Sequence, residues 1–141
     1  MITEDWNAEL GMAQCIITDT SNNVTLRGYG RAICSEEDEK YASEITGRYI
    51  ANCRARIEIM RQKRDYELKP AIMTLQHVIS TMEHSNKYNP NSYEAKRIRK
   101  ELKNLQNDLR ITCSIINDEK ESLKIYLEQK DAIYRKLDEN N

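Results

Sequence analysis

The sequence predicts an α+β protein that is mostly helical, with an N-terminal β-hairpin followed by a long antiparallel helical hairpin of coiled-coil character. Only 4 glycines and 2 prolines occur in 141 residues, which argues against turn-rich sandwiches and barrels. β-Branched residues and a turn cluster occupy positions 13–34, and beyond them apolar residues recur at helical spacing. The length favours a single domain over residues 1–141.

The hairpin is predicted over residues 13–34. Its first strand, 13–18, is rich in β-branched residues, and a cluster of Asp, Thr, Ser and Asn at 19–23 forms the turn. The second strand follows at 24–34. Residues 1–12 show no sustained pattern and are interpreted as an N-terminal arm.

Alternation along the second strand separates two faces. One face carries Val24, Leu26 and Gly28, and the other carries Thr25, Arg27 and Tyr29. Gly28 and Gly30 inside a strand indicate either a bulge or a close approach of another backbone. A bulge would change the face on which Arg31 lies, so its orientation stays open.

The first helix is predicted over residues 35–84. Ser35 can cap it, and the acidic residues that follow suit the positive end of the helix dipole. Its apolar face comprises Tyr41, Ile45, Tyr49, Cys53, Ile57, Met60, Leu68, Ile72, Leu75, Ile79 and Met82. Pro70 lacks an N–H donor and clashes with the preceding turn, so a kink is expected near residues 67–69.

A polar loop at 85–92 precedes the second helix, predicted over residues 93–138. Asn91 and Glu94 have the spacing of a capping box. Nine of twelve positions in a heptad frame are apolar, which favours coiled-coil packing. The frame comprises residues 98, 102, 105, 109, 112, 116, 119, 123, 126, 130, 133 and 137, with Thr112, Glu119 and Lys130 as its polar members.

One helix pair and two strands leave apolar faces uncovered, and an isolated two-stranded ribbon is only marginally stable. We therefore expect a homo-oligomer, in which hairpins complete a sheet or helices form a bundle.

Composition excludes several classes of protein. The net charge of −1 argues against a globally basic nucleic-acid binder, so nucleic acid is not an expected partner, although a local basic patch is compatible with it. No apolar run approaches a membrane span, and no signal peptide is visible. The four cysteines lack metal-ligand spacing and are interpreted as small, reduced, buried residues of a cytoplasmic protein. No catalytic motif is evident, so we expect a non-enzymatic protein without metal or cofactor.

Basic and aromatic residues supply the candidate binding groups. Arginine's planar fork suits phosphate, and aromatic rings with nearby amides suit nucleobases. Tyr88, Asn91 and Tyr93 flank or occupy the polar loop, and Arg27 is added on chemical grounds. Two basic clusters stand out: Arg48, Arg54, Arg56, Arg61, Lys63 and Arg64, and then Lys96, Arg97, Arg99, Lys100 and Lys103. Each of these side chains can equally belong to a solvated face, with some ion pairs across the hairpin.

A segment over residues 30–55 resembles a family of small phage proteins. It reads Gly30-Arg31-Ala32-Ile33-Cys34-Ser35-Glu36-Glu37-Asp38, then Glu44-Ile45-Thr46-Gly47, Ala51 and Arg54-Ala55. This pattern is similar to that of the phage anti-Thoeris sponge proteins, which sequester cyclic ADP-ribose isomers and have also been associated with other cyclic oligonucleotides.

The resemblance implies an oligomer in the host bacterial cytoplasm with a ligand pocket at a subunit interface. By motif position it assigns Arg54 and Arg31 to that pocket. Tyrosine would replace the phenylalanines expected there, because the chain contains no Phe.

Our leading hypothesis is a phage counter-defence protein that holds a cyclic nucleotide signal unchanged. The alternative is a phage-encoded coiled-coil module that inhibits a host or defence protein through its helical face. A nucleic-acid binder that uses the basic clusters is a third hypothesis.

Overall fold

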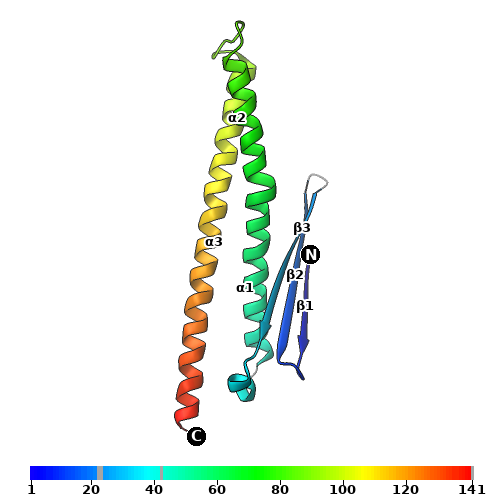
Figure 1. Cartoon of the computed structure of the whole chain (residues 1–141), viewed down its shortest axis with the longest axis vertical. Coiled ribbons are helices and arrows are strands. Elements are labelled where there is room, and N and C mark those ends of the chain that lie inside the picture. The colour runs from blue at the N-terminus through cyan, green and yellow to red at the C-terminus, as the bar shows by residue number, and fades with distance from the viewer. Residues whose placement is uncertain (22–23, 42, 141) are drawn as a thin grey trace. The chain divides into compact units, whose positions relative to one another are not determined.

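The chain begins with a three-stranded antiparallel sheet of order β1-β2-β3 (Figure 1). Its strands are β1 (Ile2–Asn7), β2 (Met12–Ser21) and β3 (Val24–Ile33). The computed structural model describes residues 1–21, 24–41 and 43–140. The predicted hairpin is present as β2 and β3, which pair continuously from Ser21 opposite Val24 to Met12 opposite Ile33. The two glycines of β3 therefore mark a close approach rather than a bulge.

Strand β1 corrects the interpretation of residues 1–12 as an arm. It pairs with β2 from Ile2 opposite Ile17 to Asn7 opposite Met12. Trp6 lies against the core of the sheet's inner face. Four of the six residues in β1 are polar or acidic, and Glu4, Asp5 and Asn7 among them have weak strand propensity. Pairing with β2 therefore decides the conformation of this segment, rather than its own sequence.

Most of the described residues after β3 are helical, apart from the loop at residues 84–92. Its elements are η1 (Glu36–Tyr41), α1 (Glu44–Gln62), η2 (Lys63–Leu68), α2 (Lys69–Glu83) and α3 (Tyr93–Glu139). Contacts divide the chain into two compact units, which we call the sheet unit (Met1–Arg61 and Ile115–Asn141) and the loop unit (Gln62–Ser114). Helix α3 contributes residues to both units.

Both predicted helix caps shift along the chain. Residues 36–41 form a short 3₁₀ helix, and α1 begins only at Glu44, where the Ser43 Oγ accepts a hydrogen bond from the Thr46 N–H at 3.5 Å. At the start of α3 the Ser92 Oγ accepts from the Ala95 N–H at 3.2 Å, so the cap is Ser92 rather than Asn91.

Pro70 follows a change in helix type. The sequence predicts a kink near residues 67–69, and the structure has the π-helical segment η2 directly before α2. The Lys69 N–H bonds the Arg64 carbonyl, five residues back. The wider turn accommodates the proline, which has no N–H of its own to continue the helix ladder.

Helix α1 and strand β3 approach so closely that only glycine fits on the strand. A Cβ atom at Gly30 would overlap the Ala51 carbonyl, and one at Gly28 would overlap the Ala55 carbonyl. Ala51 and Ala55 are themselves fully buried. Small residues on both elements therefore bring the helix backbone onto the strand.

Helix α1 is buried on two sides, which the single predicted stripe does not describe. Gly47, Ala51 and Ala55 face the sheet, whereas the Tyr49 ring contacts Tyr126 of α3 with centroids 4.3 Å apart. The stripe also includes Ile45, which is 82 % exposed. Ile45 lies in the first turn of α1, outside both buried faces.

The heptad frame of α3 describes burial along most of the helix. Its positions from Ile98 to Lys130 are buried or half-buried, including Thr112, whereas Ile133 and Leu137 are exposed. Tyr134 takes the inner position instead, where its ring lies 5.0 Å from that of Tyr41. Supercoiling and oligomerisation remain predictions.

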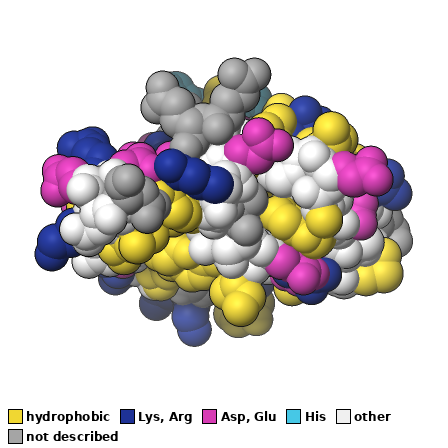
Figure 2. Space-filling model, turned by 90° about the horizontal axis from the view of Figure 1, so that it is seen from below, with side chains coloured by type: hydrophobic (Ala, Val, Ile, Leu, Met, Phe, Trp, Pro, Cys, Tyr) yellow, Lys and Arg dark blue, Asp and Glu magenta, His cyan; other side chains and the backbone are white. Residues whose placement is uncertain are grey.

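The end of the sheet unit is held by polar contacts between η1 and the last turns of α3. The Tyr134 hydroxyl donates to the Tyr41 carbonyl at 3.2 Å, and the Tyr41 hydroxyl donates to Asp138 at 2.8 Å. Lys40 and Asp138 form an ion pair at 2.7 Å. Figure 2, seen from below, shows hydrophobic side chains interspersed with charges of both signs.

We predict that Gly30→Ala destabilises the protein by at least about 2 kcal/mol, because overpacking against a backbone carbonyl cannot be relieved by a rotamer change. Gly47→Ala is the matched comparison. A Cβ there meets the movable Trp6 ring at 2.8 Å, and alanine favours the helix by about 1 kcal/mol. Urea denaturation measures both free energies of unfolding. A cost for Gly30→Ala no larger than that for Gly47→Ala would contradict the close approach.

Candidate functional site

The outer face of β3 brings two of the predicted arginines next to a tyrosine. Arg27, Tyr29 and Arg31 alternate with the buried residues of the strand, and Tyr29 is 59 % exposed. On β2, Tyr29 stands opposite Ile16 and Arg31 opposite Gln14. An open depression of about 320 Å³ is lined by Gln14, Ile16, Tyr29 and Arg31, among others. Arg31 therefore lies on the outer face, which settles the orientation left open by the sequence.

Arg54 reaches this strand from α1. Its Nη1 donates a hydrogen bond to the Arg31 carbonyl at 2.7 Å. Because β3 is an edge strand, Arg54 supplies a donor where a neighbouring strand is missing. A guanidinium carries five N–H donors, and no other bond from Arg54 is found among the described residues.

The other three predicted residues belong to the loop unit. The Tyr88 ring lies 5.4 Å from the Arg99 guanidinium, and its buried hydroxyl has no hydrogen-bond partner among the described residues. The Asn91 N–H donates to the Asn89 side chain at 2.9 Å. Tyr93 is 83 % exposed. The structure thus divides the predicted set between the two units.

Tyr29 is the residue of this surface that the sequence hypothesis leaves out. Its position on the polar face of the predicted strand is already evident from the alternation of side chains. The signal is the spacing Arg27-x-Tyr29-x-Arg31, which in an uninterrupted strand places all three side chains on one face.

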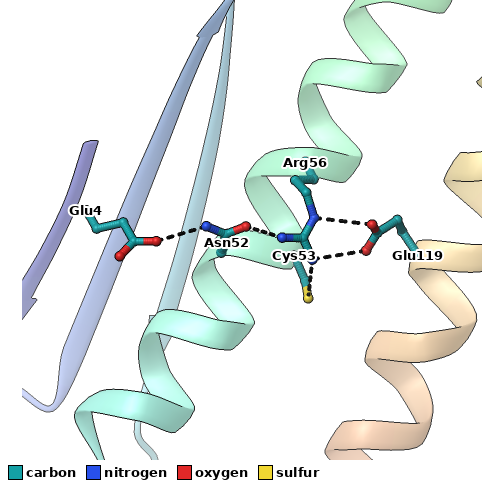
Figure 3. A network of polar contacts seen from close by, with 5 residues as sticks. All are labelled: Glu4, Asn52, Cys53, Arg56 and Glu119. Atoms are coloured by element: carbon teal, nitrogen blue, oxygen red, sulfur yellow. Dashed lines mark hydrogen bonds and ion pairs between the residues drawn. The ribbon is translucent and has the colours of Figure 1, made fainter. Parts of the chain in front are cut away.

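A second polar arrangement in the sheet unit involves Arg56 (Figure 3). Arg56 donates to both carboxylate oxygens of Glu119, from Nε at 3.2 Å and from Nη2 at 3.3 Å. It also donates to the Asn52 side-chain oxygen, and Asn52 donates in turn to Glu4 at 2.9 Å. The network thus links β1, α1 and α3.

The charge of Arg56 is compensated by groups of the protein itself. Burial of the guanidinium opposes its charge, but the hydrogen bonds and charge of Glu119 outweigh burial and raise the pKa of Arg56. With its donors engaged by protein groups, Arg56 is not arranged to receive an anion. The sequence signal is Glu119 itself, a charge within the apolar heptad frame of α3.

Lys130, another polar member of that frame, lies beside a small cavity. The ammonium group is 3.6 Å from Asp38 and 3.1 Å from Asp131. The cavity, bordered also by Trp6 and Tyr134, measures about 50 Å³. That volume holds one or two water molecules, far less than a nucleotide needs.

Two further features are absent from the described part of the chain. Residues 1–21, 24–41 and 43–140 contain no group of three or more His, Cys, Asp or Glu side chains that could hold a metal ion. Within these residues, no helix has the length and apolarity needed to cross a bilayer. Cys15 and Cys53 are fully buried, Cys34 and Cys113 are half-buried, and all four are free thiols.

Comparison of the chain with protein-family models, with curated proteins and with solved structures found no match.

We predict that the Arg56–Glu119 pair couples α1 to α3 by about 1 kcal/mol. Both groups are partly exposed, so the coupling falls between that of a surface ion pair and that of a buried one. A double-mutant cycle with Arg56→Gln and Glu119→Gln, followed by urea denaturation, measures it. The exposed Arg48–Glu44 pair on α1 is the control, with an expected coupling of about 0.3–0.5 kcal/mol. Equal coupling in both cycles would contradict the role of the network.

Proposed function

We propose that the protein binds and sequesters a cyclic nucleotide signal, a cyclic ADP-ribose isomer or a cyclic oligonucleotide, without degrading it. The observation that carries this proposal is the exposed row of Arg27, Tyr29 and Arg31 on β3. Guanidinium groups bind phosphate through paired N–H donors, and a tyrosine ring stacks on a base. Alternate residues of a strand lie about 7 Å apart, so the Tyr29 ring has Arg27 on one side and Arg31 on the other. These distances are comparable with the size of one compact ligand.

Arg54 supports the same proposal. Its guanidinium is already anchored on the Arg31 carbonyl, which lowers the cost of ordering it around a phosphate. In the proposed site the remaining donors of Arg54 and the side chain of Arg31 hold one phosphate, and Tyr29 stacks on the base. This role requires affinity and no catalytic group.

The resemblance of residues 30–55 to anti-Thoeris sponge proteins supplies the class of ligand. It also supplies the proposed setting, the cytoplasm of a phage-infected bacterium. We further propose that the protein is a homo-oligomer. Exposed apolar side chains on α3, such as Ile125 and Ile133, are available to a second copy.

We predict that Arg54→Ala and Arg31→Ala each weaken binding of a cyclic ADP-ribose isomer at least about tenfold, because each removes a charge-assisted phosphate contact. Isothermal titration calorimetry measures the affinity, and mass spectrometry of the heat-released ligand tests whether it is unchanged. Arg48→Ala is the control, an exposed arginine of α1 paired with Glu44.

Wild-type affinity in the Arg54→Ala variant would remove Arg54 from the site. No binding of a cyclic ADP-ribose isomer or cyclic oligonucleotide by the wild-type protein would remove the proposed function.

A protein-binding module that inhibits a host or defence protein is the alternative. It is favoured by an open groove in the sheet unit, where Tyr49 and Ile115 are both partly exposed. Under this alternative Arg54 serves only to cap the edge of β3. Binding of one stoichiometric protein, lost in Tyr49→Ser and retained in Arg31→Ala, distinguishes it from the sponge.

A further inference from the structure

The loop unit carries an excess of positive charge that is not evident from the net charge of the whole chain. Of the 22 Lys and Arg residues, ten lie between positions 62 and 114, against six of the 23 Asp and Glu residues. The rest of the chain carries twelve basic and seventeen acidic residues. The net charge of −1 is therefore the sum of an acidic unit and a basic one.

Part of this charge forms a stripe along α3. Positions 93, 96, 100, 103, 107 and 110 recur at steps of three and four residues, so they share one face of the helix. All six residues are exposed, and none is acidic. The stripe comprises Tyr93, Lys96, Lys100, Lys103, Asn107 and Arg110.

The stripe is not explained by the stability of the helix. Lys96 and Lys100 are four residues apart, and Lys100 and Lys103 are three apart, so these like charges repel one another. Their ammonium groups form no ion pair with any residue that the structure describes. An external anion would relieve this repulsion.

We propose that this face of α3 binds single-stranded nucleic acid, through a site separate from the proposed nucleotide site on β3. Lysines at steps of four and three residues are about 6 and 4.5 Å apart along the helix, so they offer a row of cations to the row of charges on a phosphate backbone. The exposed Tyr93 ring at one end offers a stacking surface for a base.

The composition of the stripe distinguishes this partner from other polyanions. A membrane-surface helix needs a large apolar face turned to the lipid, whereas the apolar face of this segment, Ile98 among its residues, is buried in the protein. An acidic protein would satisfy the lysines but gives no role to Tyr93. Asn107, which accepts a hydrogen bond from Arg110 at 2.7 Å, adds a polar amide between the cations.

Fluorescence anisotropy of the full-length protein with a labelled 20-nucleotide oligouridine tests the proposal. We expect Lys96→Gln, Lys100→Gln and Lys103→Gln together to weaken binding at least about tenfold and to lower the salt slope by about 2. The control removes three exposed lysines from the C-terminal part of the same helix. It combines Lys120→Gln, Lys124→Gln and Lys136→Gln and should change the affinity less than about twofold.

Tyr93→Ala should weaken binding at least about fivefold and leave the salt slope unchanged, because stacking releases no counterions. Absence of binding at 50 mM salt, equal losses in the two triple variants, or equal competition by polyglutamate would each overturn the proposal. Equal affinity for a duplex, with no effect of Tyr93→Ala, would overturn the single-stranded assignment. Circular dichroism confirms that each variant keeps its helical content.

Discussion

The contact between the backbones of α1 and β3 is the constraint on which the sheet unit depends. Gly28 and Gly30 have no side chain because the carbonyls of Ala55 and Ala51 occupy that space. From Gly28 to Ala32 the inner face of β3 carries only small residues, and the large side chains of this stretch, Tyr29 and Arg31, project outward. The same close approach brings Arg54 within hydrogen-bond distance of the Arg31 carbonyl. The strand therefore packs on α1 through its small residues and carries Tyr29 and Arg31 on its opposite face.

The elements that the sequence predicts well are those in which large apolar or β-branched side chains carry the pattern. β2 and β3 follow from β-branched residues around a polar turn, and the burial of α3 follows its heptad frame as far as Lys130. The sequence pattern does not predict that α1 is buried on two sides. Gly47, Ala51 and Ala55 form a tight interface with the sheet, but such small residues contribute little to a hydrophobic pattern. Strand β1 is not predicted either, because its polar residues adopt a strand only through pairing with β2.

The sequence suggests individual residues of the candidate site, but it does not predict which of them lie close together. The resemblance selects Arg31 and Arg54 by motif position, and chemistry selects Tyr93 as a group that suits a base. Neither argument assigns these residues to a unit of the fold. The structure groups Arg31 with Arg54 through one hydrogen bond and places Tyr93 in the loop unit. Alternation alone places Tyr29 on one face with Arg27, but the uninterrupted register of β2 and β3 is needed to place Arg31 on that face as well.

Both proposed surfaces combine basic side chains with tyrosine, yet their geometry suits ligands of different size. On β3 the Tyr29 ring lies between Arg27 and Arg31, and Arg54 bonds the Arg31 carbonyl. The cations of this surface are therefore grouped around one ring. On α3 three lysines and Arg110 recur along one face of the helix, so the cations follow a line. A compact molecule with one or two phosphates satisfies the first arrangement and would leave most of the second unpaired. A polymer satisfies the second, because each added phosphate meets another lysine and releases another counterion.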